Sequence, residues 1–121
     1  MASKKVLTDA FIDQFSSFLG ELAEMYPEDA DFAMFKTTFS IFKMTPFVVV
    51  KYVKDNVLKF EDQIMKKDET FFMNYDFAEY QSDMDMNVFH KLRQYVTTMS
   101  PASKESVWKY IQNIIRLAKA I

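Results

Sequence analysis

Glycine is almost missing from this chain: Gly20 is the only one among 121 residues. Tight turns with positive φ use glycine most readily, so a chain with one glycine has few places for the hairpin turns of a β-sheet. The three prolines do not replace it, because proline fixes φ at a negative value. The composition therefore argues against a β-sandwich and a glycine-rich α/β fold, and it predicts an all-α protein.

The longest amphipathic pattern runs from Ser100 to Ile121. Ser100 has the side chain of an N-cap, and Pro101 suits the first helical position, where the missing N–H is not needed. Apolar residues then recur at spacings of 4, 3, 4 and 3, the period of a helix that buries one face. They are Val107, Ile111, Ile114, Ala118 and Ile121. This stripe must be covered, so we expect earlier helices to pack on it.

Two earlier stretches predict a pair of helices separated by a proline. The first helix is expected to begin at the N-cap Thr8, after a flexible tail of residues 1–7. Its apolar stripe is Phe11, Phe15, Phe18, Leu22 and Met25. Tyr26 should end this helix, because the residue before a proline is pushed out of the α region. Pro27 is then expected to open a second helix with the stripe Phe32, Phe35, Phe39 and Phe42.

Further helices are predicted on both sides of an acidic stretch. Thr45 and Pro46 repeat the pattern of a capping side chain before proline, which predicts a third helix. Its expected inner face is Phe47, Val50, Val53 and Val57. A later helix is expected to start at Ser82 or Asp83 and to run to the break at Ser100.

Together these stretches predict one compact bundle of five to six amphipathic helices, with residues 8–121 forming a single helical domain. The expected core combines one or two apolar residues from each helix. These are Phe15, Leu22, Phe35, Phe39, Val53, Phe89, Leu92, Ile111 and Ile114. The chain lacks a stretch of transmembrane length, so we expect a soluble protein without membrane insertion.

Charge alternates along the chain in four blocks. Residues 1–31 and 68–87 are acidic, with net charges of −5 and −6, while residues 32–67 and 88–121 are basic, with +4 and +5. Complementary blocks attract each other within one molecule or between copies.

The acid-aromatic segment from Asp68 to Tyr80 is the predicted partner-binding site. It carries more aromatic area than a short loop easily buries, and aromatic side chains commonly anchor interfaces. The proposed contact residues are Asp68, Glu69, Phe71, Phe72, Tyr75, Asp76 and Phe77. Flanking acids favour a lysine-rich partner surface, either on another protein or on a second copy of the chain. The alternative that Phe71 and Phe72 simply fill the bundle stays open.

Nucleic acid is the alternative partner. Lys109, Gln112, Arg116 and Lys119 follow one flank of the last predicted helix, where they could contact phosphates. The acidic overall charge argues against this alternative, because nucleic-acid-binding proteins usually concentrate positive charge.

Catalytic and metal-binding patterns are weak. The chain has no cysteine and one histidine, His90, which rules out thiolate chemistry and multi-histidine sites. Asp83 to Asn87 have the oxygen-ligand spacing of a calcium loop, but Val88 and Gln94 occupy the positions of its required glycine and glutamate. We therefore expect a non-enzymatic interaction or structural protein with no catalytic residue, cofactor or metal.

Three short runs carry a resemblance to known proteins. They are residues 68–72 (DETFF), 92–95 (LRQY) and 106–111 (SVWKYI). In this order they resemble small uncharacterised proteins encoded by large nucleocytoplasmic DNA viruses of algae and protists, over most of the chain from about Phe18 onward. The resemblance implies a viral protein in the host cytoplasm, the nucleus or the virion; otherwise a cytoplasmic location is expected. It implies no substrate and no active-site residue.

Overall fold

A computed structural model describes residues 3–75 and 91–121 of the chain. Within these ranges all regular secondary structure is helical and no strand occurs, so the prediction of an all-α bundle is confirmed.

Three long helices and several short ones form the structure. The long helices are α1 (Lys4–Met25), α2 (Ala30–Ile41) and α7 (Pro101–Ala120). The shorter elements are the 3₁₀ turn η1 (Phe42–Met44), α3 (Pro46–Asn56), the 3₁₀ turn η2 (Leu58–Phe60), α4 (Glu61–Met65), α5 (Glu69–Asn74), a helical stretch at 91–95, and the 3₁₀ turn η4 (Val96–Thr98).

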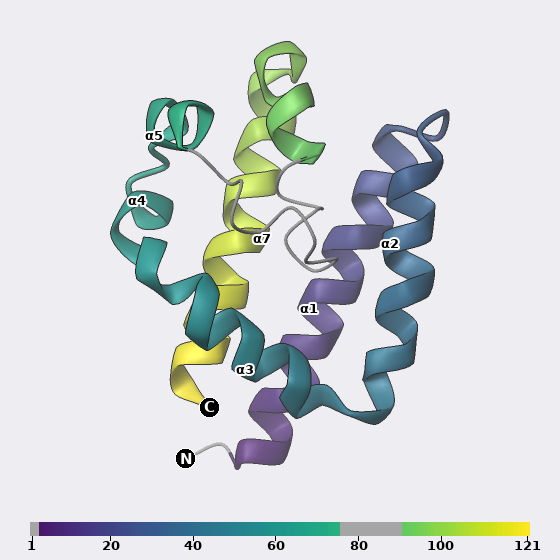
Figure 1. The fold of residues 1–121 in the computed structure, drawn as a ribbon, viewed down its shortest axis with the longest axis vertical. Helices are drawn as coiled ribbons and strands as arrows, with labels where there is room; N and C mark the ends of the chain where they lie inside the picture. Colours follow the sequence, from purple (N-terminus) through teal and green to yellow (C-terminus); the bar gives the residue numbers. More distant parts are fainter. Residues whose placement is uncertain (1–2, 76–90) are drawn as a thin grey trace.

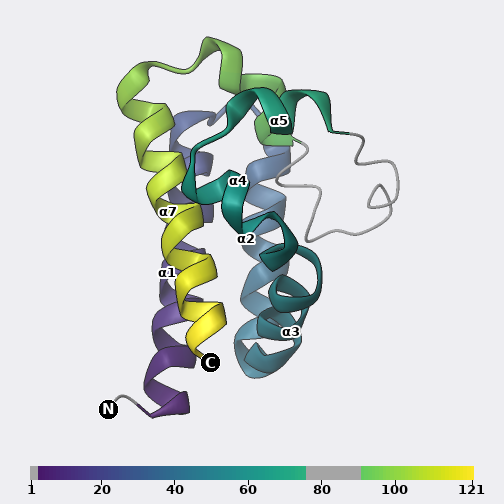
Figure 2. The same ribbon diagram turned by 90° about the vertical axis from the view of Figure 1, so that its left-hand side faces the viewer.

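Helix α1 lies between α2 and α7, and both neighbours run antiparallel to it (Figures 1 and 2). Helix α3 crosses near the end of the bundle where α1 begins and contacts both α1 and α7. From there α4 packs along α7. Both chain termini lie at the same end of the molecule as the corner between α2 and α3.

The core is built from the apolar faces of α1, α2, α3 and α7. Its most deeply buried large side chains include Phe11, Phe18, Leu22, Phe32 and Ile115. The predicted core residues that the structure describes are all buried: Phe15, Leu22, Phe35, Phe39, Val53, Leu92, Ile111 and Ile114. Phe89 and the predicted caps Ser82 and Asp83 lie outside the described residues.

Helix α7 begins as its sequence predicts. The Ser100 Oγ accepts a hydrogen bond from the Ser103 N–H at 3.1 Å, and Pro101 is the first helical residue. The stripe from Val107 to Ala118 is buried against the other helices, and Ile121 is half-buried.

The start of α1 differs from the prediction. Residues 4–7 are helical, so the expected flexible tail of residues 1–7 is wrong for this part, and Ser3 is the N-cap, accepting from the Val6 N–H at 3.2 Å. Thr8 is buried inside the helix. It lies three and four residues before Phe11 and Ile12, so it shares their core-facing side and does not serve as a cap.

The starts of α2 and α3 each correct one prediction. Tyr26 caps the C-terminus of α1 as expected, but Pro27 lies in a turn and α2 is capped by Asp29, which accepts from the Asp31 N–H at 3.0 Å. Pro46 opens α3 as expected, although the Thr45 hydroxyl makes no capping bond. Phe47 was expected on the inner face but is 61% exposed, because the buried face of α3 is formed by Val49, Val50 and Val53.

Candidate partner-binding site

The first part of the acid-aromatic segment forms α5, and the end of α4 sets where this helix begins. Lys67 has a φ of 55°, and this left-handed residue reverses the chain. The Asp68 N–H then donates to the Gln63 carbonyl oxygen at 2.9 Å, and the Lys67 N–H donates to that of Ile64 at 3.1 Å. The Asp68 carboxylate caps the next helix by accepting from the Phe71 N–H at 3.0 Å. Asp68 therefore has a local structural role.

The aromatic side chains of α5 gather around Phe60. Its ring centroid lies 6.0 Å from Phe71, 5.9 Å from Phe72 and 5.0 Å from Tyr75. Phe60 is buried, while the three rings of the acid-aromatic segment are half-buried. Phe71 and Phe72, the two residues of the filling alternative, therefore pack against the core together with Tyr75. The Phe72 ring also lies 5.9 Å from the Trp108 ring.

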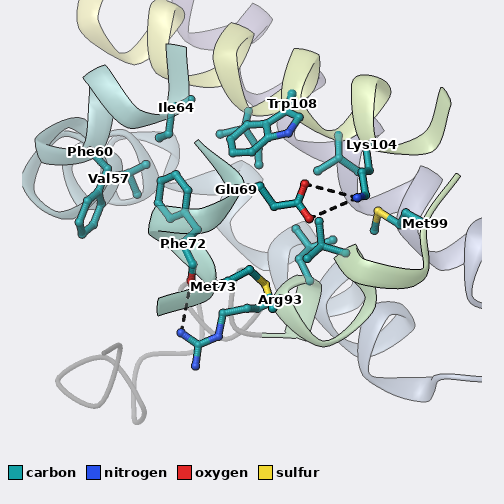
Figure 3. Close-up of a pocket in the computed structure, with 14 residues that line it drawn as sticks. Val57, Phe60, Ile64, Glu69, Phe72, Met73, Arg93, Met99, Lys104 and Trp108 are labelled. Atoms are coloured by element: carbon teal, nitrogen blue, oxygen red, sulfur yellow. Dashed lines mark hydrogen bonds and ion pairs between the residues drawn. The ribbon is translucent and has the colours of Figure 1, made fainter. Parts of the chain in front are cut away.

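An apolar cavity of about 100 Å³ opens beside Phe72, between α5, residues 92–99 and α7 (Figure 3). We call it the Trp108 cavity. Its walls are mostly aliphatic, aromatic and methionine side chains. It is lined by Val57, Phe60, Ile64, Glu69, Phe72, Met73, Leu92, Arg93, Val96, Met99, Lys104, Val107, Trp108 and Ile111.

Three charged residues are part of the lining of this cavity. The Lys104 Nζ lies 3.2 Å from the Glu69 Oε1, and both side chains are about one-third exposed. Arg93 donates from its Nη1 to the backbone carbonyl oxygens of Phe72 and Tyr75, which ties the stretch 91–95 to the end of α5. An apolar ligand group would thus enter next to fixed charges of both signs.

A second polar cluster joins the stretch 91–95 to the start of α2. The Lys91 Nζ lies 3.0 Å from the Asp29 Oδ2 and 2.9 Å from the Asp31 Oδ2, and the Tyr95 hydroxyl donates to Asp29. The hydrogen bond to the Asp31 carboxylate, and after it the one to Asp29, raise the pKa of Lys91 well above its usual range. The hydrogen bond from Tyr95 is the main reason that the pKa of Asp29 is lowered. Tyr95 also stacks on Tyr26 with a centroid distance of 4.1 Å.

No family model, curated protein or solved structure matches this chain.

The predicted partner-binding residues are therefore only partly brought together. Glu69 and Phe72 line the Trp108 cavity, Phe71 and Tyr75 pack against Phe60, and Asp68 caps α5. Asp76 and Phe77 lie outside the described residues. The sequence pattern did not predict that Arg93, Lys104 and Trp108 lie beside these residues in the lining of the cavity. The available signal was charge, since the basic block 88–121 supplies the cations that meet the acidic block 68–87.

The basic flank proposed for nucleic acid lies along α4. The Gln112 Nε2 donates to the backbone carbonyl oxygen of Ile64 at 3.1 Å, and the Lys119 Nζ lies 3.0 Å from a Glu61 carboxylate oxygen. Arg116 contacts Asn113 and the Met65 sulfur, while Lys109 is exposed. Gln112 and Lys119 thus hold α4 against α7.

A metal-binding cluster and a membrane-spanning helix are both absent from residues 3–75 and 91–121. No group of three or more His, Cys, Asp or Glu side chains there could hold a metal ion; His90 and the Asp83–Asn87 stretch lie outside them. No single helix in those ranges is both long and apolar enough to cross a membrane, and α2–η1 with α3 reaches that length and composition only as a pair bent by 113°.

Proposed function

We propose that this protein is a non-enzymatic interaction protein that binds another protein through the Trp108 cavity. The observation that carries the proposal is an apolar cavity whose lining also includes the charged side chains of Glu69, Lys104 and Arg93. Protein interfaces of this kind combine an apolar pocket for one anchoring side chain with charged groups that orient the partner.

The size of the cavity favours a side chain over a cofactor. Its volume is about 100 Å³, whereas an engineered apolar cavity of about 150 Å³ admits benzene. The volume of one leucine or methionine side chain is of the same order as this cavity. Met73 and Met99 in the wall would help to fit such a group, because methionine side chains are unbranched and adapt their shape.

The basic flank supports this proposal over nucleic-acid binding. Gln112, Arg116 and Lys119 already have partners within the molecule, so three of the four flank residues are engaged. The resemblance noted above supports a place of action in an infected host cell or in the virion, and the partner would be a protein found there or a second copy of the chain.

The test uses Trp108, the only tryptophan of the chain, as a reporter. Peptides selected from a random displayed library on the immobilised protein would be titrated while the Trp108 emission is recorded. We expect selected peptides to share a leucine or methionine anchor and to shift this emission. Val96→Phe fills the cavity and should weaken their binding about tenfold or more, because the anchor loses its pocket.

Gln94→Ala is the matched control, since Gln94 is exposed in the same stretch and does not line the cavity. Its affinity for the peptides should equal that of the wild type, and urea unfolding would establish that both variants fold. Equal binding by Val96→Phe, or an absence of enriched peptides, would contradict the proposal. Sedimentation velocity would show whether the natural partner is a second copy.

A further inference from the structure

The corner between α2 and α3 exposes large apolar side chains. Ile41 is 69% exposed, Met44 88%, Phe47 61% and Val48 53%. These four residues, which we call the apolar corner, lie within eight consecutive positions that include η1. Soluble monomers rarely keep such a group together on the surface without using it.

The apolar corner lies at one end of the molecule. Helix α2 with η1 meets α3 at a bend of 113°, and this bend lies at the end where α1 begins and α7 ends (Figures 1 and 2). The first turns of α1 lie at the same end and add Val6, which is 58% exposed.

Lysines dominate the charge in the sequence around the apolar corner. The charged residues between positions 34 and 54 are four exposed lysines, Lys36, Lys43, Lys51 and Lys54, and no acid occurs in this stretch. Lys43 is part of η1 itself. On α3, Lys51 and Lys54 follow Phe47 at spacings of 4 and 3, so they share its face of the helix. Lys51 lies 2.8 Å from Asp55, the first acid after the stretch.

We propose that the apolar corner docks on the surface of an anionic lipid bilayer. Met44, Phe47 and Ile41 enter the boundary between headgroups and acyl chains, while Lys43, Lys51 and Lys54 contact anionic headgroups. The strength of binding to a bilayer surface depends on the apolar area that enters the bilayer and on the attraction between basic side chains and anionic lipids. The core faces of α2 and α3 stay packed, so the protein lies on the bilayer without crossing it. This surface is separate from the Trp108 cavity.

Vesicle sedimentation tests the proposal with the full chain. Binding to phosphatidylcholine vesicles that contain phosphatidylserine is expected to exceed binding to pure phosphatidylcholine and to fall with added salt, because the lysine contribution is screened. The double variants Met44→Ser/Phe47→Ser and Lys43→Glu/Lys51→Glu should each lower the affinity at least about tenfold. All four side chains are exposed, so urea midpoints should stay near that of the wild type.

Two single variants outside the apolar corner make the same kinds of substitution and serve as controls. Met34→Ser alters an exposed methionine ten positions before Met44, and Lys109→Glu alters an exposed lysine of α7. Both should bind vesicles as the wild type does. The proposal is overturned if no vesicle binds, if the corner variants bind as tightly as these controls, or if sedimentation velocity shows a dimer that depends on Phe47 without vesicle binding. The last result would make the corner an interface between copies.

Discussion

Gly20 lies inside α1, where a glycine can allow close approach of another helix. The structure shows no such approach. A Cβ added at Gly20 would meet only the end of the Lys36 side chain, with the Nζ at 3.8 Å and the Cε at 3.9 Å, which is ordinary contact. The backbone φ at Gly20 is not positive, so a side chain causes no strain. The glycine therefore weakens α1 without a packing benefit.

Gly20→Ala is expected to raise the free energy of unfolding by about 1 kcal/mol, because alanine has the higher helix propensity and its methyl group fits beside Lys36. Urea unfolding followed by circular dichroism measures the change. Ser17→Ala, at an exposed position of the same helix, should give a smaller gain. A lower midpoint for Gly20→Ala would show that Lys36 cannot adjust.

At the scale of the element, the turn that follows the short helix α4 contains a residue with an unfavourable backbone conformation. Lys67 is the only described residue other than glycine with a positive φ. The position recurs at helix ends and is most often glycine. The Lys67 side chain is ion-paired with Glu105 of α7, which links the turn to the long helix. Side-chain pairing and backbone strain thus oppose each other at one residue.

Two variants of Lys67 separate these effects. Lys67→Ala removes the ion pair and keeps the strain, whereas Lys67→Gly removes both. We expect the glycine variant to be more stable than the alanine variant by about 1 kcal/mol, the cost of a left-handed conformation for a residue with a Cβ. Equal urea midpoints for the two variants would contradict this expectation.

At the scale of the whole molecule, ion pairs connect charge blocks that lie far apart in the sequence. Lys91 joins block 88–121 to Asp29 and Asp31 in block 1–31, and Lys104 joins it to Glu69 in block 68–87. The complementary blocks therefore attract each other within one molecule. Lys91 and Tyr95 attach the stretch before α7 to the turn between α1 and α2.

This arrangement predicts sensitivity to acid. The pKa of Asp29 is lowered from its usual 3.8, mainly by the Tyr95 hydroxyl and also by Lys91. A lowered pKa means that ionised Asp29 contributes stability above that usual value, and the contribution is lost as pH falls through the lower folded value. The urea midpoint of the wild type should therefore drop below about pH 4.

Asp29→Asn should be less stable than the wild type at neutral pH and should show a weaker drop in acid. Asparagine still caps α2, so the difference reports the carboxylate and its bonds to Tyr95 and Lys91. Asp13→Asn, at an exposed position of α1, is the control and should keep the wild-type pH dependence. If the urea midpoints of the wild type and of Asp29→Asn fall equally as the pH is lowered, the acid sensitivity comes from other groups.

The amino-acid sequence by itself determined the helical class, the start of α7 at Ser100 and Pro101, and most of the core stripe, including Phe35, Phe39 and Ile111. These features depend on capping and on spacing within a few turns, so neighbouring residues are enough to specify them. The sequence also indicated Glu69 and Phe72, because acids and aromatics are concentrated around them.

Only the tertiary structure decided which faces and side chains meet. Phe47 and Val49 fit a helical spacing equally well, and packing against α1 and α7 buries Val49 and leaves Phe47 outside. The Trp108 cavity likewise joins Glu69 to Lys104, 35 positions later. Such a contact depends on how the α4 turn at Lys67 and the Ser100 break direct the chain, and local spacing carries no information about the relative position of two helices.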